Sequence, residues 1–529
     1  MAVKKLLFLF SVITVVSGIL PNKCVSADDA RLKAAHRQRR ITFNNDGDDA
    51  WNGGAPATKE GFLSLRMDHI GDCGVDSVFY CTSRCLNMCT HDSKVTEVMT
   101  TKEGGFKFNR MSELIALGTD PLQLAIESCR QKNIEIFWTM RMNDVHDFYV
   151  PELKSQWKKD HPEMLIGTLE ESAPYKDKSD DPRQIGTWAD FAHPEVCEVT
   201  LRTIKDVLDR YDVDGIDLDF MRHPCYFKET RRMEPVTPEH RDILTDLVSR
   251  IREAVLAASQ RKGKPILLSA RILPTVALNQ KFGFDMEKWI TGGYLDFITT
   301  GCGYDPFTMP AEMIDRGHAW GVPVYRCLSD SGMTQELVSD SDLVNGNIAA
   351  WRGAASNAWH DGVDGIMTFN LFPNGPGTQT PMVRTAWQQM GDSKGLVGRD
   401  KLFCIEHLHY DNWSWMLGSC PREGRLPVTL NPGDAVTRML PVGDDIASLT
   451  NRVETLRLRV FLDFQAGDNV EVTINGTRLN TAPEKPFWLA ADVPPAIMKS
   501  GPNELMVRFA SGITGSLVLR SVELKVKYK

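Results

Sequence analysis

The sequence lacks the features that mark several large classes of protein. It has no stretch rich in lysine and arginine, and its formal net charge is −8 over 529 residues. A strongly basic nucleic-acid-binding protein is therefore excluded, because an acidic chain repels phosphate. Hydrophobic residues make up 42% of the chain, which is typical of a globular protein rather than a disordered or fibrous one. The length is sufficient for two or three domains, or for one large barrel with an addition.

Only the start of the chain carries a long apolar run. Two lysines precede residues 6–20, and Val25 and Ala27 follow where small residues are expected before a cleavage site. We therefore predict a signal peptide over residues 1–27 and a mature protein that is secreted or periplasmic, with no membrane contact after cleavage. The alternative is an uncleaved anchor, for which the apolar run is short.

Between residues 38 and 391, strand-like segments alternate with helical patterns. Three helices are marked by a capping residue followed by proline, at Asp120-Pro121, Thr237-Pro238 and Thr380-Pro381. No glycine-rich turn such as GxGxxG follows an early strand, which argues against a nucleotide-binding open sheet. An α/β fold of the closed (β/α)8 TIM-barrel type is therefore predicted. The eight expected strands are 40–46, 76–82, 135–141, 215–222, 266–272, 296–301, 322–327 and 365–370.

After residue 391 the pattern changes to strict alternation of apolar and polar residues. This period is typical of strands with one buried face. Asn475-Gly476 is a signal for a tight hairpin turn. We predict a C-terminal β-sandwich as an accessory domain over residues 400–529, after a catalytic barrel over residues 38–391. The alternating rows are Leu456, Leu458, Val460, Leu462; Val470, Val472, Ile474; Leu505, Val507, Phe509; and Val522, Leu524, Val526.

The strongest candidate for a functional site is the segment VDGIDLDFMRHP at residues 213–224. Asp217 and Asp219 are two residues apart on a strand and therefore point to the same side, into the barrel. Two buried carboxylates are costly unless they are paired or used, and their proximity pushes their protonation apart. The alternative is that both aspartates only bind loops and a neighbouring arginine.

Other polar residues lie at the carboxyl ends of the remaining strands, where TIM-barrel active sites form. Asp144, His146 or Asp305 is expected to supply a second acid or base beside Asp217 and Asp219. The residues predicted to bind substrate are Asn44, Asp46, Arg141, Asn143, Arg222, His223, Arg271, Tyr304, Arg326 and Asn370.

The arginines at strand ends permit two interpretations. Arg141, Arg222, Arg271 and Arg326 could each pair with a nearby aspartate. They could instead bind an anionic substrate, because a planar guanidinium binds the carboxylate of a uronate or a sulfate through two hydrogen bonds. The sequence leaves both interpretations open.

Several motifs together resemble one bacterial family. The segments RITFNNDGDD, VDSVFYC, WTMRMNDVHD and YDVDGIDLDFMRHP are similar to the glycosyl-hydrolase-like 10 group, and the similarity extends over residues 38–391. The resemblance implies a TIM barrel of glycoside-hydrolase type, commonly with added β-sandwich domains. The fourth-strand motif also resembles the chitinase pattern DGxDxDxE, but Met221 stands at the position of the catalytic Glu. By analogy with barrel glycosidases of the α-galactosidase type, Asp219 is the expected nucleophile.

These observations predict an exported glycoside hydrolase that acts on a polysaccharide or oligosaccharide without a metal or cofactor. An anionic glycan, with uronate or sulfate groups, is one of the substrates that the arginines suggest. Asp219 is the principal carboxylate and Asp217 orients it or tunes its protonation. A non-catalytic polysaccharide-binding protein on a barrel scaffold is the first alternative, and a metal-dependent hydrolase the second. The sugar, the stereochemical outcome and the oligomeric state are left open.

Overall fold

The computed structural model describes residues 27–176, 181–303, 307–329, 347–373, 380–405, 426–463 and 469–529. All of the predicted signal peptide except Ala27, and the predicted site residues Tyr304 and Asp305, lie outside these ranges. Among the described residues, no helix is both long and apolar enough to cross a membrane.

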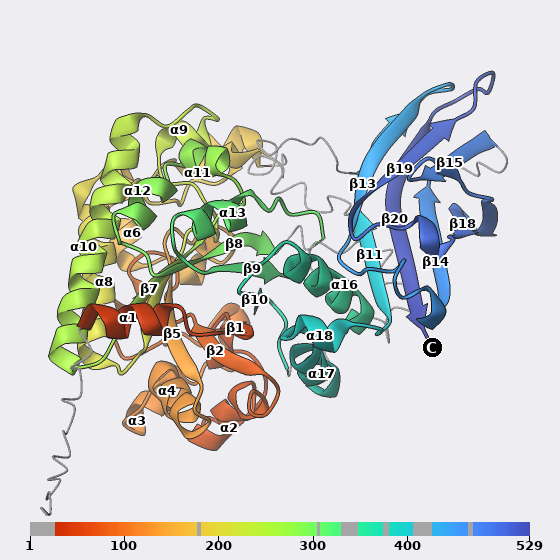
Figure 1. Cartoon of the computed structure of the whole chain (residues 1–529). Coiled ribbons are helices and arrows are strands. Elements are labelled where there is room, and N and C mark those ends of the chain that lie inside the picture. Colours follow the sequence, from red (N-terminus) through yellow and green to blue (C-terminus); the bar gives the residue numbers. More distant parts are fainter. Residues whose placement is uncertain are drawn as a thin grey trace, which may run out of the picture.

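Eight parallel strands close into a barrel, as the sequence predicts (Figure 1). Their order is β1-β10-β9-β8-β7-β6-β5-β2, so the first strand pairs with the last. The fold is therefore a TIM barrel. The strands are β1 (Ile41–Asn45), β2 (Val75–Tyr80), β5 (Glu135–Arg141), β6 (Gly215–Asp219), β7 (Leu267–Ile272), β8 (Phe297–Gly303), β9 (Val324–Leu328) and β10 (Gly365–Thr368). Strands β3 (Met88–Cys89) and β4 (Glu97–Val98) form a separate pair between β2 and β5.

Strand β6 ends three residues before the predicted boundary at Arg222. The side chain of Asp219 causes this, because its Oδ1 accepts the backbone N–H groups of Met221 and Arg222, each at 3.0 Å. An aspartate that binds the backbone two residues ahead stabilises a turn. Strand β10 likewise ends at Thr368, and Asn370 beyond it has a φ of 58°, which is incompatible with a strand.

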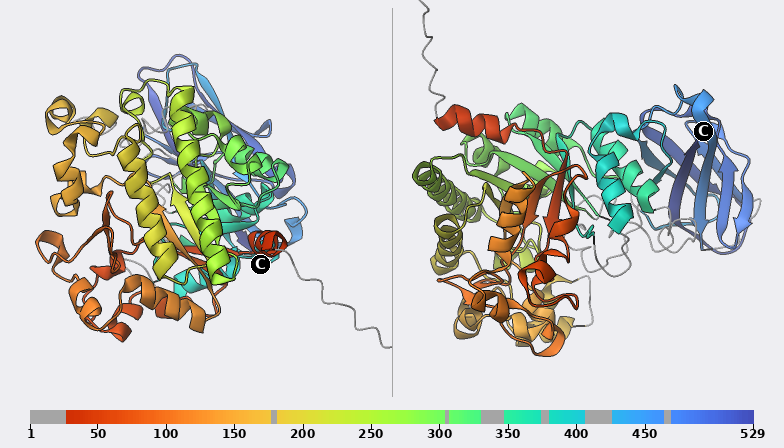
Figure 2. Two further views of the ribbon diagram at one scale, coloured as in Figure 1. Left: turned by 90° about the vertical axis from the view of Figure 1, so that its left-hand side faces the viewer. Right: turned by 90° about the horizontal axis from the view of Figure 1, so that it is seen from below.

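Helices cover the outside of the barrel (Figure 2). Asp120 and Thr237 cap α4 and α10 as predicted, and Thr380-Pro381 opens α17. The helices are α1 (Ala27–Ala35), α2 (Lys59–Leu63), α3 (Met111–Ala116), α4 (Pro121–Gln131), α5 (His146–Tyr149), α6 (Gln156–Asp160), α7 (Leu169–Ser172), α8 (Pro194–Arg210), α9 (Lys228–Arg231), α10 (Pro238–Lys262), α11 (Val276–Phe282), α12 (Met286–Thr291), α13 (Glu312–Ala319), α16 (Asn347–His360), α17 (Thr380–Met390) and α18 (Ser393–Leu396).

Helix α1 was not predicted and packs against the amino ends of the barrel strands. Its Arg31 binds Asp296, just before β8, at 2.6 Å. Arg39, in the segment between α1 and β1, is fully buried and binds Glu135, the first residue of β5, also at 2.6 Å. These ion pairs fix α1 and the segment after it to the end of the barrel that lies opposite the predicted site.

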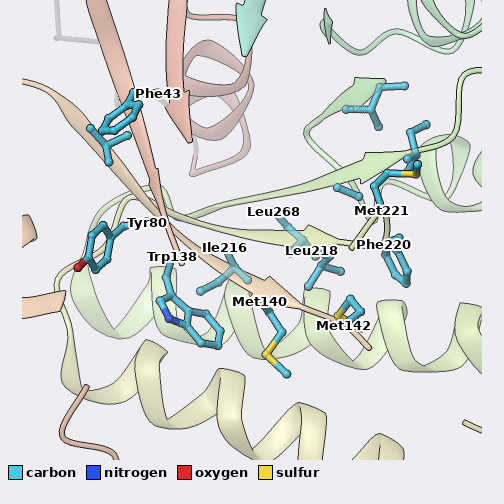
Figure 3. Close-up of a cluster of buried hydrophobic side chains, with 14 of the residues drawn as sticks. Phe43, Tyr80, Trp138, Met140, Met142, Ile216, Leu218, Phe220, Met221 and Leu268 are labelled. Atoms are coloured by element: carbon cyan, nitrogen blue, oxygen red, sulfur yellow. The ribbon is translucent and has the colours of Figure 1, made fainter. Parts of the chain in front are cut away.

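The two faces of the barrel strands differ in character. On β6, Ile216 and Leu218 point toward the helices and join an apolar layer with Trp138 (Figure 3). On the opposite face the rings of Phe79 and Phe137 stack with centroids 4.7 Å apart inside the barrel. Asp217 and Asp219 alternate with Ile216 and Leu218, so both carboxylates point into the barrel interior.

The C-terminal residues form two antiparallel sheets that share one apolar core. All the predicted alternating rows are buried in this core, so the sandwich is confirmed. Asn475 and Gly476 have φ values of 49° and 77°, as the predicted hairpin turn requires. One sheet holds β11 (Lys401–Ile405), β12 (Val428–Leu430), β14 (Val453–Leu462), β17 (Ala482–Lys485), β18 (Trp488–Asp492) and β20 (Leu517–Tyr528), and the other holds β13 (Ala435–Val442), β15 (Val470–Ile474), β16 (Thr477–Arg478) and β19 (Gly501–Phe509).

The barrel and the sandwich pack closely through α16 and β11. A Cβ placed on Gly353 of α16 would lie 1.9 Å from the carbonyl oxygen of Leu402, so only glycine permits this approach. Beside it, Asp444 of the sandwich accepts hydrogen bonds from Ser356 Oγ at 2.6 Å and from Lys401 Nζ at 2.7 Å. The sandwich is thus firmly attached to the barrel by backbone contact and by a buried polar network.

Gly353→Ala should push α16 away from Leu402 of β11 and lower the free energy of unfolding by about 1–3 kcal/mol, the usual cost of overpacking. The measurement is thermal unfolding followed by circular dichroism. Gly105→Ala is the matched control, because a Cβ there meets nothing within 4 Å. Equal midpoints for the two variants would show that the close approach does not matter.

Candidate active site

Polar side chains from five adjacent strands meet at the carboxyl end of the barrel. These strands are β7, β6, β5, β2 and β1 in their order around the barrel. Asp46, His146 and Arg222 are partly exposed, and the other members are buried. We call this set the strand-end cluster: Asp46, Arg84, Arg141, Asp144, His146, Asp219, Arg222, His223 and Arg271.

Asp219 and Arg271 form a buried two-pronged ion pair. Arg271 donates from Nε to Oδ1 at 3.0 Å and from Nη2 to Oδ2 at 2.6 Å. Oδ1 also accepts hydrogen bonds from two backbone N–H groups. Among the described residues, Arg271 is the one donor to Oδ2. A carboxylate oxygen has two lone pairs, so Oδ2 retains the capacity for a further contact.

Asp217 lies one layer deeper in the barrel. It accepts hydrogen bonds from Ser269 Oγ at 2.8 Å and from Thr139 Oγ1 at 3.5 Å. Burial, and after it the carboxylate of Asp219, raises the pKa of Asp217 to about 7. The two aspartates therefore differ in their surroundings: Asp219 is paired with the Arg271 guanidinium, whereas Asp217 keeps its proton below neutral pH.

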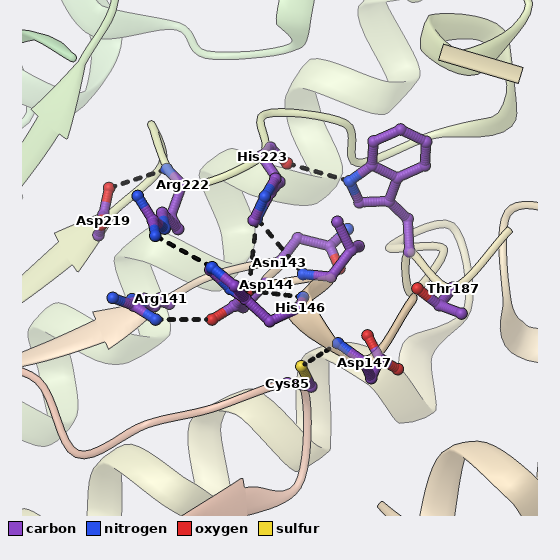
Figure 4. Close-up of polar contacts among 12 residues, drawn as sticks. Cys85, Arg141, Asn143, Asp144, His146, Asp147, Thr187, Asp219, Arg222 and His223 are labelled. Atoms are coloured by element: carbon purple, nitrogen blue, oxygen red, sulfur yellow. Dashed lines mark hydrogen bonds and ion pairs between the residues drawn. The ribbon is translucent and has the colours of Figure 1, made fainter. Parts of the chain in front are cut away.

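Asp144 lies beside two histidines and orients His146 (Figure 4). Its Oδ1 contacts Nδ1 of His146 and lies 3.3 Å from Nδ1 of His223, while its Oδ2 accepts from Arg141 at 2.9 Å. His146 Nε2 lies 3.0 Å from Nη2 of Arg222. Because a guanidinium only donates, Nε2 must be the acceptor, and the ring proton of a neutral His146 lies on Nδ1 facing Asp144.

The surroundings of these groups fix their charges. Burial alone would raise the pKa of Asp144, but His146 and Arg141 outweigh it and hold that pKa well below its usual value. Burial, together with Arg222 and Arg141, lowers the pKa of His146 below 6.5. Burial likewise lowers the pKa of His223 to about 3. Both imidazoles are therefore neutral at pH 7 while Asp144 is ionised.

Asp144, His146 and His223 offer donor atoms within 4.8 Å of one another, as a metal site would. The arrangement does not fit a divalent cation. Val145 N–H points at Nδ1 of His223 at 3.4 Å, and guanidinium groups contact both Asp144 and His146. A cation at this position would face two positive charges, and Asp144 and His146 are better explained as a hydrogen-bonded pair.

The four arginines predicted at strand ends have different partners. Arg141 binds Asp46 and Asp144, each at 2.9 Å, and Arg271 binds Asp219. These two follow the pairing interpretation. Arg222 does not, because its one ion pair among the described residues is with Asp46 at 3.9 Å.

Arg326 is a correction to the predicted site. On β9 it alternates with Tyr325 and Cys327, which point into the barrel, so its side chain points outward toward the helices. It is fully buried there and binds Asp361, at the end of α16, at 2.6 Å. Arg326 is the central residue of β9 rather than a residue at its end, and the ion pair with Asp361 does not support the predicted function in substrate binding.

The remaining predicted residues have mainly structural contacts. Asn143 ties loops together, because its Nδ2 donates to the carbonyl oxygens of Ala189 and Cys225 at 2.8 and 2.6 Å. Asn44 donates to Asp46 Oδ1 at 3.1 Å and so holds that carboxylate. Asn370 is half-buried after β10.

Two members of the site were missed by the sequence analysis. Arg84 follows β2 and donates to the carbonyl oxygen of Asp46 at 2.7 Å. Phe369 follows β10, and the guanidiniums of Arg271 and Arg222 lie 4.6 and 5.5 Å from its ring centroid. Arg84 could have been found by searching for polar residues after the carboxyl end of β2, as was done for the other strands. Phe369 is apolar, so that search would not have identified it.

A cleft of about 550 Å³ lies elsewhere, between the barrel and the sandwich. Phe307, Met309 and Met439 contribute to its mainly apolar lining. Its carboxylate, Asp361, is already bound to Arg326. The described residues that line this cleft do not include paired acid and base groups like those of the strand-end cluster, which is therefore the stronger candidate for chemistry.

The family model of glycosyl hydrolase-like 10 matches residues 105–325. The matched segment contains β5 to β8 and therefore Arg141, Asp144, His146 and Asp219. The resemblance inferred from the sequence is confirmed over this segment. No curated protein matches the chain.

Similar solved structures are carbohydrate-active proteins at low identity. A cycloisomaltooligosaccharide glucanotransferase from Paenibacillus sp. has 10% identity and a TM-score of 0.35, with 92% of this chain and 57% of that one covered. An α-amylase from Anoxybacillus has 10% identity and a TM-score of 0.39, with coverages of 90% and 98%. Chitinase ChiW from Paenibacillus sp. has 15% identity and a TM-score of 0.38, with coverages of 91% and 53%. Similarities at this level do not identify a substrate.

The two aspartates of β6 should respond differently to neutralisation. Asp219→Asn leaves Arg271 buried without its counter-charge and should cost about 3–5 kcal/mol of unfolding free energy. Asp217→Asn replaces a carboxyl that is protonated below pH 7 and should change stability little at pH 6. Urea unfolding at pH 6 measures both. A loss for Asp217→Asn as large as that for Asp219→Asn would contradict the assigned charges.

Proposed function

We propose that this protein is exported and hydrolyses glycosidic bonds in a polysaccharide or oligosaccharide. The observation that carries the proposal is the strand-end cluster, in which an ionised Asp219 and a neutral, oriented His146 lie at the carboxyl end of a glycoside-hydrolase-like barrel. The export rests on the basic and apolar start of the sequence.

Asp219 is the carboxylate that acts on the sugar. The transition state of glycoside hydrolysis carries positive charge on the sugar ring, and a fixed carboxylate stabilises it or attacks it. Arg271 and two backbone N–H groups hold Asp219 in place, and Oδ2 retains a lone pair for the sugar. Asp217, one layer deeper in the barrel, keeps its proton, so it adds no second negative charge beside Asp219.

His146 is the group that takes the proton of the attacking water. Asp144 holds its Nδ1–H, which leaves Nε2 as the basic nitrogen and stabilises the imidazolium that forms. Asp144 itself is too strongly stabilised as an anion to donate a proton. Asp305 remains the candidate from the sequence for the proton donor to the leaving oxygen, and it lies outside the described residues.

The chitinase mechanism is not part of this proposal. Met221, at the position of the chitinase Glu, is 3% exposed and packs in the apolar layer outside the barrel. A thioether cannot transfer a proton, so the chemistry must rely on other groups.

We include in this proposal that the glycan carries negative charge. The strand-end cluster contains four arginines and three aspartates, and Asp217, one layer deeper, keeps its proton below neutral pH. Neither Arg84 nor Arg222 has a carboxylate oxygen closer than 3.9 Å among the described residues, and of the two only Arg222, with 15% exposure, reaches solvent. A uronate carboxylate or a sulfate ester is the chemical complement of such a group.

Replacing the proposed catalytic groups should abolish hydrolysis. His146→Gln should lower kcat by about 10² to 10⁴-fold, the usual contribution of a general base, and Asp219→Asn by on the order of 10² or more. Product analysis after incubation with neutral, uronate-containing and sulfated polysaccharides is the measurement, with folding checked by circular dichroism.

His36→Gln is the control, because His36 is exposed near the opposite end of the barrel. Glycan binding without any product in the unmodified protein would favour the non-catalytic alternative. Loss of activity in a chelator, restored by a divalent metal, would favour the metal-dependent alternative. Full activity of His146→Gln would remove this residue from the mechanism.

The pH profile should show the ionisation of His146. Its pKa lies below 6.5, so the basic form is present at neutral pH and disappears as the pH falls. We expect kcat/KM to fall only below pH 6.5. Asp144→Asn should move this fall in kcat/KM, the acid limb of the profile, to lower pH, because the carboxylate raises the pKa of His146. Asp217→Asn should leave the limb in place, and a limb that vanished in this variant would assign it to Asp217 instead.

A further inference from the structure

The basic nitrogen proposed for catalysis is blocked in this structure. Nη2 of Arg222 lies 3.0 Å from Nε2 of His146 (Figure 4). A donor at this distance occupies the lone pair that a water molecule would need. The site as described therefore has its catalytic groups in place but its base covered.

The contacts of Arg222 are weak compared with those of its neighbours. Arg141 and Arg271 each bind carboxylates within 2.9 Å. Arg222 instead lies 3.9 Å from Asp46, whose oxygens already bind Arg141 and Asn44. Its Nε is buried without a hydrogen-bond partner among the described residues.

The anchoring of Arg222 permits its side chain to move. Its backbone N–H is held by Asp219 Oδ1 at 3.0 Å, so the start of the side chain is fixed. The guanidinium at the other end is held by a neutral imidazole and lies 5.5 Å from the ring centroid of Phe369. A hydrogen bond to an anion is about twice as strong as one to a neutral acceptor. An anionic group on a bound sugar would therefore compete successfully with His146 for this guanidinium.

We propose that Arg222 is a latch: it covers Nε2 of His146 until a carboxylate or sulfate group on the glycan draws the guanidinium away. Binding of the anionic sugar and exposure of the base are then one event. This inference rests on the proposed function and assigns to Arg222 the selection of anionic over neutral glycans. Arg222 is a positioning residue here, because it acts on the reaction through His146.

The latch is tested first without turnover. The full-length protein, labelled with ¹⁵N at histidine, is titrated with sodium glucuronate, glucose 6-sulfate or glucose at constant ionic strength, and the His146 signal is identified with His146→Gln. Both anions should shift the Nε2 resonance and glucose should not. In Arg222→Met the resonance should start at a different position and should not respond to anions. Arg232→Met, which removes an exposed neighbouring charge, should behave like the unmodified protein.

Turnover provides the second test. On matched oligosaccharides with and without a uronate or sulfate group, the unmodified protein should prefer the anionic substrate in kcat. Arg222→Met should reduce this preference at least tenfold, with a rise in KM for the anionic substrate. If glycans are cleaved but neither anion shifts His146, the latch is wrong. If the shift occurs but no glycan is cleaved, the proposed function is wrong and the latch remains.

Discussion

The burial of Asp217 and Asp219 side by side within a closed barrel is the constraint on which the rest of the site depends. Two ionised carboxylates in a medium of low dielectric repel each other and lack the solvation of water. The structure resolves this in two ways: Arg271 neutralises Asp219, and burial favours the protonated form of Asp217. Arg271 is thereby fixed across the strand end, and Asp219 uses its Oδ1 to turn the chain toward Arg222.

The same requirement for neutral pairs extends around the barrel mouth. Arg141 joins Asp46 to Asp144, and Asp144 in turn orients His146. Each of these charges has a close partner of opposite sign, which offsets part of the cost of removing it from water. Arg222 is different, because its closest contact is a neutral ring. In the proposed mechanism, the negative charge of the glycan would provide the partner that Arg222 lacks.

Patterns of local sequence predicted the fold well. Strand spacing, capping residues before prolines and the alternation after residue 391 identified the barrel strands, several helices and the sandwich, because each pattern reflects one buried face. Helix α1 was not predicted, because its amphipathic pattern is weak and it is held by long-range ion pairs such as that of Arg31 with Asp296. The early end of β6 was also not predicted, because it depends on the side chain of Asp219 accepting the backbone N–H of Met221.

For the candidate site, the sequence by itself determined which residues lie at strand ends and that Asp217 and Asp219 share the interior face. It could do so because a strand alternates its side chains with a period of two. Only the tertiary structure decided the partners: Arg271 for Asp219, Asp361 for Arg326, and His146 for Arg222. Hydrogen bonds and ion pairs act over about 3 Å, and distances of that size between strands far apart in the chain are set only when the barrel closes.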